Sequence, residues 1–231
     1  MRILAIDTAL GACAAAVYDS EAGSTAAIES LAMARGHAEA LLPLIARVMD
    51  QAGIEFLELD RIAVTVGPGS FTGLRVGIAA ARGIALAAGR PAVGVSTLAA
   101  YAAPHIAIDR AEAVAVAIDA RNNQIYFQLF GPGGRSLVSP RHVAISEAVG
   151  LEPVRALERA SYMAGSAATL LAAAWPAAYP PPVVAESKPA PDIEWVARLG
   201  AAAQAGLAPP KPAYLRPPGA QPQDSAGLPR Q

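Results

Sequence analysis

The sequence predicts an α/β protein in which mixed sheets are flanked by helices, and three observations lead to this class. The expected order over the first hundred residues is strand, strand, strand, helix, strand, helix, strand, with short spacers between the first three strands. A second unit begins near residue 113 and opens in the same way, with a strand that ends in aspartate and a hairpin, which is a weak internal duplication. With 231 residues, 54% of them hydrophobic, the chain has material for one large domain or two small ones.

The elements of the first unit follow from the pattern of apolar residues. Apolar runs between short spacers predict strands at 2–7, 12–18, 24–31, 61–66 and 92–96. A three-four rhythm predicts a helix at 36–52 that ends at Gly53, and an alanine-rich run predicts a second helix at 71–89. Pro43 lies inside the first helix, where it removes one backbone hydrogen bond and is expected to kink the helix.

The second unit is shorter and less regular. Strands at 113–119 and 124–130, joined by the turn at 120–123, predict another hairpin. Helix candidates follow at 166–174 and 191–205. Residues 209–231 are rich in proline, glycine and glutamine, and we expect disorder beyond Arg216.

Composition and charge narrow the class of protein. The formal net charge is -1, so no global basic field recruits nucleic acid. The single cysteine, Cys13, sits in an apolar run and is predicted to be a buried structural thiol rather than a reactive one. Asp7 interrupts the opening apolar run, and Pro176 breaks the best candidate for a membrane span, so neither a signal peptide nor a span is expected. We therefore expect a cytoplasmic globular protein.

A glycine-rich turn at 67–75 (GPGSFTGLR) lies between the strand at 61–66 and the following helix. This arrangement points free backbone N–H groups outward and suits a phosphate or a carboxylate. The turn lacks the Gly-Lys-Ser/Thr of a Walker A motif and the glycine spacing of the dinucleotide fingerprint. A plain tight turn is the alternative, because Pro-Gly pairs commonly mark turns.

Two aspartates, Asp7 and Asp119, stand at strand ends, where they could hold a metal or a water near a nucleotide phosphate. Actin-like ATPases and sugar kinases use such aspartates, each followed closely by glycine so that the backbone approaches the phosphate. Here Ala9 and Arg121 occupy the corresponding positions, and their Cβ atoms obstruct that approach. The alternative is that both aspartates accept hydrogen bonds in tight turns. A residual nucleotide or anion site would comprise Asp7, Gly67, Gly69, Ser70 and Asp119.

The sequence offers no catalytic or metal-binding set. His37, His105 and His142 lack the spacing of metal ligands and have no cysteine beside them, so neither a metal nor another cofactor is expected. His37 is instead expected to cap or line the start of its helix. Ser70 lacks the Gly-x-Ser-x-Gly context, and no Ser-His-Asp set can be proposed.

A stripe of small residues marks the helix at 71–89. Gly73, Gly77, Ala81 and Ala85 are spaced four apart and would let a second helix approach closely. The alternative is that this stripe faces the chain's own sheet. Because the helix is small or apolar nearly all round, we expect a partner to cover one of its faces.

Six segments carry a resemblance to a known family. They are IDTA at 6–9 with Cys13, His37 with LLP at 41–43, GPGSFTGLRVG at 67–77, GVSTL at 94–98, IDAR at 118–121 and PAYLR at 212–216. In this order, and over nearly the whole chain, these segments resemble the TsaB (YeaZ) family. The resemblance implies an actin-like (ASKHA) two-lobed fold, with an N-terminal lobe at 1–104, a reduced C-terminal lobe at 105–216 and a disordered tail at 217–231.

The resemblance also implies a function. TsaB is the non-catalytic paralogue of TsaD, the transferase that moves a threonylcarbamoyl group onto adenosine 37 of tRNA. TsaB-type chains pair with TsaD, are joined by the ATPase TsaE, form homodimers when alone and meet tRNA only through the complex. TsaD-type proteins carry a His-x-x-x-His metal motif, and the matching positions here are Thr97 and Tyr101. The resemblance therefore implies that the metal site is lost.

The family's dimer surface is formed by the two N-terminal helices. By resemblance, the interface residues here are His37, Leu41, Leu42, Ile45, Phe71, Gly73, Leu74, Gly77 and Ala81. The alternative function is an enzyme in its own right, either an actin-like phosphotransferase or ATPase, or a peptidase resembling a glycoprotease. The missing glycines after the strand-end aspartates argue against the first, and the missing histidine pair argues against a metallopeptidase.

Overall fold

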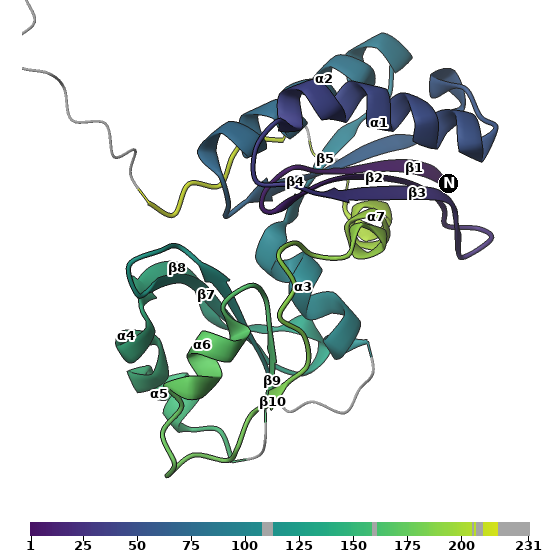
Figure 1. The fold of residues 1–231 in the computed structure, drawn as a ribbon. Coiled ribbons are helices and arrows are strands. Elements are labelled where there is room, and N and C mark those ends of the chain that lie inside the picture. Colours follow the sequence, from purple (N-terminus) through teal and green to yellow (C-terminus); the bar gives the residue numbers. More distant parts are fainter. Residues whose placement is uncertain (108–112, 159–160, 205, 207–209, 217–231) are drawn as a thin grey trace, which may run out of the picture.

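The computed structural model describes residues 1–107, 113–158, 161–204, 206 and 210–216, which form two lobes stacked one above the other (Figure 1). Each lobe is built on a five-stranded mixed sheet with helices packed on it. This is the α/β arrangement of mixed sheets flanked by helices, in two lobes, that was predicted.

The first sheet has the strand order β3-β2-β1-β4-β5. Its hairpin strands, β1 (Arg2–Asp7), β2 (Ala12–Asp19) and β3 (Ser24–Ala32), pair antiparallel, as predicted. The strands β4 (Arg61–Gly67) and β5 (Ala92–Ser96) extend the sheet on the other side of β1 in parallel. The apolar side chains of β1, β2 and β4 are buried on both faces, so the sheet needs helices on each side.

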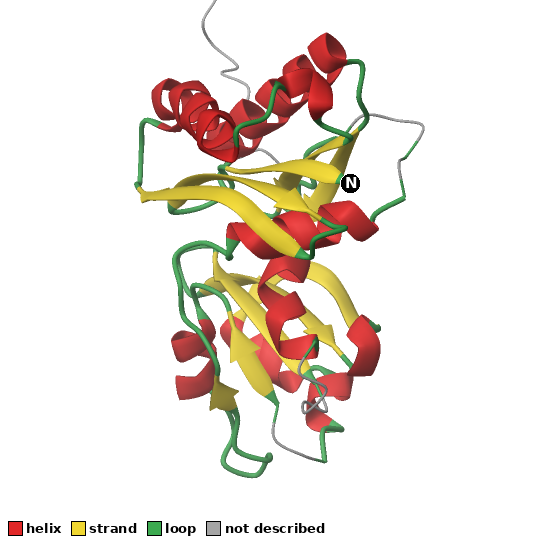
Figure 2. Ribbon diagram, turned by 90° about the vertical axis from the view of Figure 1, so that its right-hand side faces the viewer, coloured by secondary structure: helices red, strands yellow, loops and turns green. Residues whose placement is uncertain are grey.

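The helices α1 (His37–Ala52) and α2 (Phe71–Ala88) cover one face of this sheet (Figures 1 and 2). Helix α1 begins after Gly36 and ends at Gly53, and both glycines are in the left-handed region, which is common for the glycine that ends a helix. It continues through Pro43, which lies on its exposed side. The 3-10 turn η1 (Phe56–Glu58) then leads into β4.

Helix α2 begins at the N-cap Ser70, whose hydroxyl oxygen accepts a hydrogen bond from the backbone N–H of Gly73 at 3.3 Å. It ends at Gly89, as predicted. Length and hydropathy alone would allow this helix to cross a membrane. One side of it, however, is buried against β1 and β4 of its own sheet.

The second sheet repeats the connectivity of the first, with the order β10-β9-β6-β7-β8. The antiparallel strands are β6 (Val114–Asp119), β7 (Gln124–Phe130) and β8 (Ser136–Ala144), and the parallel ones are β9 (Tyr162–Ala164) and β10 (Val183–Val184). The turn η2 (Pro132–Gly134) joins β7 to β8. Strands β6, β7 and β8 correspond to β1, β2 and β3, and strands β9 and β10 correspond to β4 and β5. This correspondence confirms the internal duplication.

The outer side of this second lobe is covered by three short helices, α4 (Ile145–Gly150), α5 (Glu152–Arg155) and α6 (Ala168–Ala173). Residues of these helices share a buried cluster with β6, β7 and β9, centred on Phe127 and Leu171. Helix α6 lies where the sequence predicted a helix at 166–174.

Two helices, α3 (Thr97–Ile106) and α7 (Ile193–Ala202), lie between the sheets (Figure 2). Helix α3 contributes Leu98 and Tyr101 to the core of the second lobe. Helix α7 buries Ile193 and Val196 against β1 and β2 of the first sheet. The division at residue 104 placed α7 in the second lobe, but apolar packing joins it to the first.

The segment 210–216 returns along the first lobe, and we call it the strap. The backbone N–H of Ala213 donates to the carbonyl oxygen of Val66 at 2.7 Å, and Arg82 Nε donates to the carbonyl oxygen of Pro210 at 3.0 Å. Leu215 packs on the cluster formed by α3 and the second sheet. The strap therefore contacts both lobes. The predicted disorder beyond Arg216 lies outside the described residues.

Candidate functional site

The glycine-rich turn packs tightly on the turn between β1 and β2. The backbone N–H of Ser70 donates to the carbonyl oxygen of Ala9 at 2.7 Å, and Thr8 Oγ1 donates to the carbonyl oxygen of Gly73 at 2.7 Å. A Cβ on Gly69 or Gly73 would collide with the backbone of Ala9 or Thr8. The glycines therefore permit close contact between two segments of the same chain, as in a plain tight turn.

Asp7 is fully buried at the end of β1. Its Oδ1 accepts hydrogen bonds from the hydroxyl of Thr65 at 2.5 Å and from the backbone N–H of Ala9 at 3.0 Å. Burial raises the pKa of this carboxyl, and the bonds from Thr65 and Ala9 oppose that shift. This is the geometry of the tight-turn alternative.

Asp119, the corresponding residue of the second sheet, lies at an exposed strand end. Its Oδ1 accepts a hydrogen bond from the backbone N–H of Arg121 at 2.8 Å, and its own N–H donates to Ser166 Oγ at 3.0 Å. Arg121, Asn122 and Asn123 all have positive φ angles. Asp119 thus stabilises a left-handed turn.

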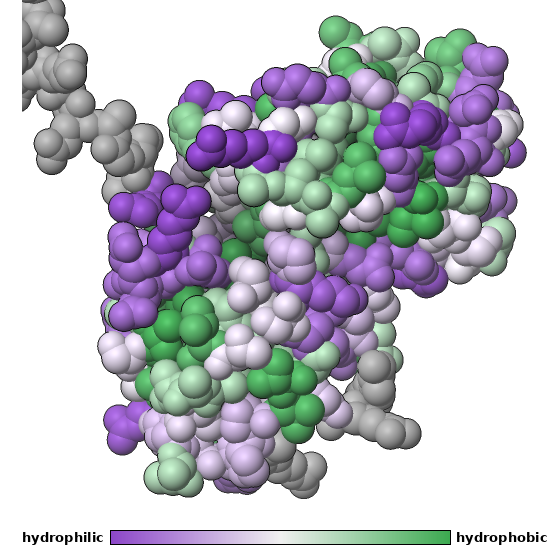
Figure 3. All heavy atoms as spheres, in the orientation of Figure 1, coloured by the Kyte–Doolittle hydropathy of each residue, from purple (hydrophilic) through white to green (hydrophobic). Residues whose placement is uncertain are grey.

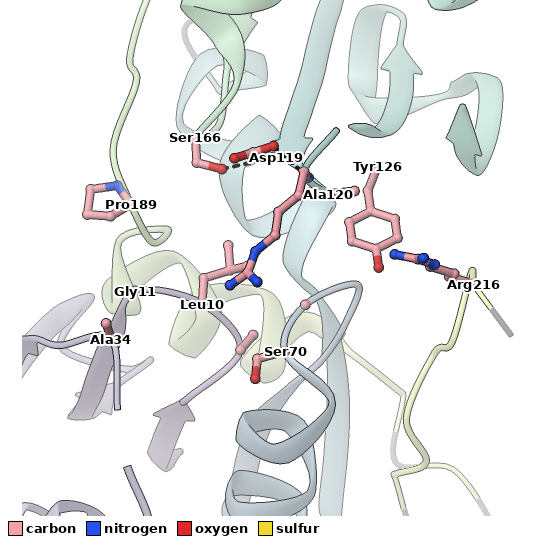
Figure 4. A pocket seen from close by; sticks show the side chains of 13 residues that line it. Leu10, Gly11, Ala34, Ser70, Asp119, Ala120, Tyr126, Ser166, Pro189 and Arg216 are labelled. Atoms are coloured by element: carbon pink, nitrogen blue, oxygen red, sulfur yellow. Dashed lines mark hydrogen bonds between the residues drawn. The ribbon is translucent and has the colours of Figure 1, made fainter. Parts of the chain in front are cut away.

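A cavity of about 570 Å³ lies between the lobes (Figure 4). It is lined by the β1–β2 turn, the glycine-rich turn, the β6–β7 hairpin and the end of the strap. Of the predicted anion-site residues, Gly69, Ser70 and Asp119 line it, whereas Asp7 and Gly67 do not. Its other polar side chains are Arg121, Tyr126, Ser166 and Arg216.

The three histidines lie apart, each in its own surroundings. His37 Nε2 is 3.1 Å from the carbonyl oxygen of Leu10, which fits its expected place at the start of α1. His105 stacks on Tyr162, and His142 lies beside Tyr126. Across the described residues, no group of three or more His, Cys, Asp or Glu side chains could hold a metal.

Thr97 and Tyr101, the positions of the family's histidine pair, both lie fully buried in α3. The hydroxyl of Tyr101 donates to the carbonyl oxygen of Lys188 at 2.8 Å. Burial raises the pKa of Tyr101, so the hydroxyl stays protonated. Neither side chain is free to bind a ligand in the cavity.

The predicted interface residues separate into two groups. Leu42 and Phe71 are exposed, and His37 is half-buried. The other members are buried against the chain's own sheet and cannot form a surface; they are Leu41, Ile45, Gly73, Leu74, Gly77 and Ala81. The small-residue stripe of α2 therefore faces inward, because Thr8 and Val64 occupy the space beside Gly77.

The exposed side of α2 is instead joined to the strap. The guanidinium of Arg75 lies 3.7 Å from the centre of the Phe71 ring, and its Nε donates to Tyr214 Oη at 3.2 Å. The Phe71 and Tyr214 rings are 5.3 Å apart. These three exposed side chains form one cluster at the start of α2, which the sequence pattern did not indicate.

Comparison with known proteins gives consistent matches. The family model of TsaD, described as tRNA N6-adenosine threonylcarbamoyltransferase, matches residues 30–182. Over 225 residues, the chain is 33% identical to an uncharacterized protein of Mycobacterium tuberculosis, covering 95% of this chain and 94% of that one. The solved structure of YeaZ from Pseudomonas aeruginosa has a TM-score of 0.73 at 30% identity, covering 93% of this chain and 99% of that one.

The chain belongs to the TsaB (YeaZ) family.

Curated TsaB proteins also match this chain, but their alignments cover a shorter part of it. The chain is 39% identical to the tRNA threonylcarbamoyladenosine biosynthesis protein TsaB of Haemophilus influenzae and 40% identical to that of Escherichia coli, each over 127 residues. These alignments cover 55% of this chain and 52% or 54% of the relatives, so the chain spans about half the length of the curated relatives it matches. A TsaB-family fold is thus established for this chain.

Proposed function

We propose that this chain is the non-catalytic subunit needed for threonylcarbamoyl modification of adenosine 37 in tRNA. In this role it pairs with a TsaD-type transferase, and TsaE binds to the pair. Membership of the TsaB family and the naming of its curated relatives support this role. The observation that carries the non-catalytic assignment is the burial of Asp7, Thr97 and Tyr101. Asp7 is enclosed in a tight turn, and Thr97 and Tyr101 stand where the family's transferase has its histidine pair.

The partner surface that we propose is the outward side of α1 and α2. It carries exposed Leu42, Phe71 and Leu86, which are 59%, 44% and 85% exposed, between small residues such as Ala79 and Gly83. Figure 3 shows hydrophobic residues over this upper lobe, interrupted by hydrophilic ones. Stable interfaces cover about 800 Å² per partner, which two adjoining helices can supply. The TsaD-type transferase is the occupant, and a second copy of the chain takes its place when the chain is alone.

Reconstitution tests the role directly. The purified chain, its cognate TsaD and TsaE, and the synthase that makes the threonylcarbamoyl adenylate would be combined with unmodified tRNA. We expect modified tRNA only when all four proteins are present, and no enzyme-like ATP hydrolysis by the chain alone. Equal modification without the chain would disprove the requirement, and rapid ATP turnover by the chain alone would favour the phosphotransferase alternative.

A matched pair of leucine variants tests the surface. Leu42→Glu places a charge on α1, whereas Leu170→Glu changes a residue of similar exposure, 51%, on α6 of the second lobe. Burying a leucine contributes roughly 1.5–3 kcal/mol, so we expect Leu42→Glu to weaken TsaD binding and self-association by about tenfold or more. Leu170→Glu should bind as the unchanged protein does. Unaltered binding by folded Leu42→Glu protein would place the interface elsewhere.

A further inference from the structure

The strap and the start of α2 share an exposed aromatic cluster that lies outside the cores of both lobes. Phe71 is 44% exposed and Tyr214 is 43% exposed, and their rings lie 5.3 Å apart. Arg75 packs on the Phe71 ring and donates to the hydroxyl of Tyr214, so the three side chains hold one another in place. Aromatic and arginine side chains that are already ordered lose little entropy when a partner covers them. The cluster therefore has the character of an interface anchor.

The path of the strap, coloured yellow in Figure 1, places Tyr214 in this cluster. Before it, the backbone N–H of Ala213 donates to the carbonyl oxygen of Val66 at 2.7 Å. After it, Leu215 packs on the cluster formed by α3 and the second sheet. Both neighbours of Tyr214 are thus attached to the protein while its own side chain remains exposed. The backbone of the strap holds this tyrosine beside the exposed side of α2.

The same region carries positive charge without a carboxylate of its own. Helix α2 and the strap contain several arginines and one lysine, and neither segment contains an aspartate or a glutamate. The acceptors of Arg75 and Arg82, the hydroxyl of Tyr214 and the carbonyl oxygen of Pro210, are both neutral. Lys211, which follows Pro210, is exposed. Among the ion pairs of the described residues, none includes these three cations.

These exposed side chains form one surface, which we call the strap surface. Its members are Phe71, Arg75, Arg82, Lys211 and Tyr214. In a chain whose net charge is -1, it is a cationic surface with an aromatic anchor.

The surroundings of the strap surface favour a protein as its partner. Phe71 belongs both to this surface and to the face of α1 and α2 that we propose for the transferase, so the two are continuous. Aromatic residues and arginine are enriched in protein–protein interfaces, where a polar rim surrounds an apolar centre. Complementary charges across such an interface guide association and exclude wrong partners. A transferase face rich in aspartate and glutamate would meet these requirements.

We propose that the strap surface is part of the interface with the TsaD-type transferase, with Tyr214 as its anchor and acidic side chains of the transferase opposite its cations. This inference rests on the proposed function, which supplies the partner. The TsaD family model matches residues 30–182, so the strap lies outside the region that this chain shares with that model. A contact made by the strap therefore helps the transferase to distinguish this chain from a second copy of itself.

Calorimetric titration of purified TsaD with variants of the chain tests the anchor. Tyr214→Ala removes the ring, and we expect it to weaken TsaD binding by about tenfold or more. Tyr214→Phe loses only the hydroxyl that Arg75 binds, so it should keep most of the affinity. Tyr179→Ala is the matched control, because Tyr179 also forms an aromatic pair, with Trp175, but on the second lobe. Folded Tyr214→Ala protein that binds as the unchanged protein does would overturn the proposal.

Charge reversal tests the acidic counterpart. The amine of Lys211 makes no hydrogen bond within the described residues, so Lys211→Glu changes the charge without breaking a contact there. We expect it to weaken TsaD binding by about threefold or more and to make binding less sensitive to salt. Arg155→Glu on α5 of the second lobe reverses an exposed charge away from the surface and should leave binding unaltered. Equal affinity and equal salt dependence of Lys211→Glu and the unchanged protein would contradict the proposal.

Leu42→Glu, measured in parallel, separates this inference from the proposed function. If the unchanged protein does not bind TsaD, both are wrong. If Leu42→Glu weakens binding while Tyr214→Ala and Lys211→Glu do not, the proposed function stands and the strap surface lies outside the interface. If the two strap variants bind TsaD normally but weaken binding of tRNA to the assembled complex, the surface binds RNA and the proposal is overturned.

Discussion

The hydroxyl of Thr8 donates a 2.7 Å hydrogen bond to the carbonyl oxygen of Gly73, joining the end of β1 to the first turn of α2. The two segments can approach this closely because Gly73 and Gly77 have no Cβ. The small-residue stripe therefore packs against the chain's own sheet, and the partner surface that we propose lies on the opposite side of the helix.

Gly77→Ala should destabilise the fold. The added Cβ would collide with Thr8 Oγ1, and overpacking of this kind costs about 1–3 kcal/mol of unfolding free energy. Gly83→Ala on the same helix is the control, because its Cβ would meet open space and alanine stabilises a helix by roughly 0.5–1 kcal/mol relative to glycine. Denaturant unfolding of both variants measures the difference. Equal stabilisation by the two changes would contradict the inward orientation of Gly77.

Asp7→Asn should alter how stability depends on pH. The folded pKa of Asp7 is raised above its ordinary value of 3.8, so the native state holds the proton more tightly than the unfolded state does. The contribution of Asp7 to stability therefore falls as pH rises from the ordinary value through the raised one, and is constant above it. Unfolding measured across pH for both proteins should show the unchanged protein losing stability relative to Asp7→Asn over this window. A gain with rising pH would contradict the assignment.

Cys13 should resist thiol reagents while the protein is folded. Its side chain is fully buried, and burial, with the negative charges of Asp7 and Glu29, raises its pKa to about 11. Alkylation at pH 8 followed by mass spectrometry should show no adduct on native protein and one adduct per chain in guanidinium chloride. Fast native labelling would mean that β2 opens readily.

The purified protein should contain no stoichiometric zinc or iron. Thr97 and Tyr101 stand where the family's transferase has histidines, and both side chains are fully buried. Elemental analysis of tag-free protein measures the metal content, with a TsaD preparation as the positive control. One tightly held metal per chain would disprove this expectation.

Local patterns predicted most elements of the first lobe and the first hairpin of the second. Strands such as β1 and helices such as α2 carry clear apolar periodicity and end at residues such as Gly89. Strand β8 was not predicted, because Pro140 interrupts its apolar pattern. An edge strand such as β8 can accommodate a proline, since one side of it has no partner strand.

The site was harder to predict than the fold. Glycines spaced four apart allow close packing, but the spacing does not say whether the neighbour is the chain's own sheet or a partner. The contribution of Arg216 to the cavity depends on the path of the strap, which long-range contacts determine. Sequence did identify Arg121 as an obstacle to a kinase-like phosphate site, and the structure places this residue at the cavity.

The placement of α7 has a consequence for synthesis on the ribosome. Ile3 and Ala5 of the first strand share a buried cluster with Ile193 and Val196 near the end of the chain. Roughly 190 residues separate them, and at about 5–20 residues per second their translation takes roughly 10–40 s. Until then one face of the first sheet lacks the cover of α7 and is packed only by residues of α3 such as Ala100, whereas the strands of the second sheet all lie within residues 114–184. The lobe that is synthesised first is therefore the last to be completed.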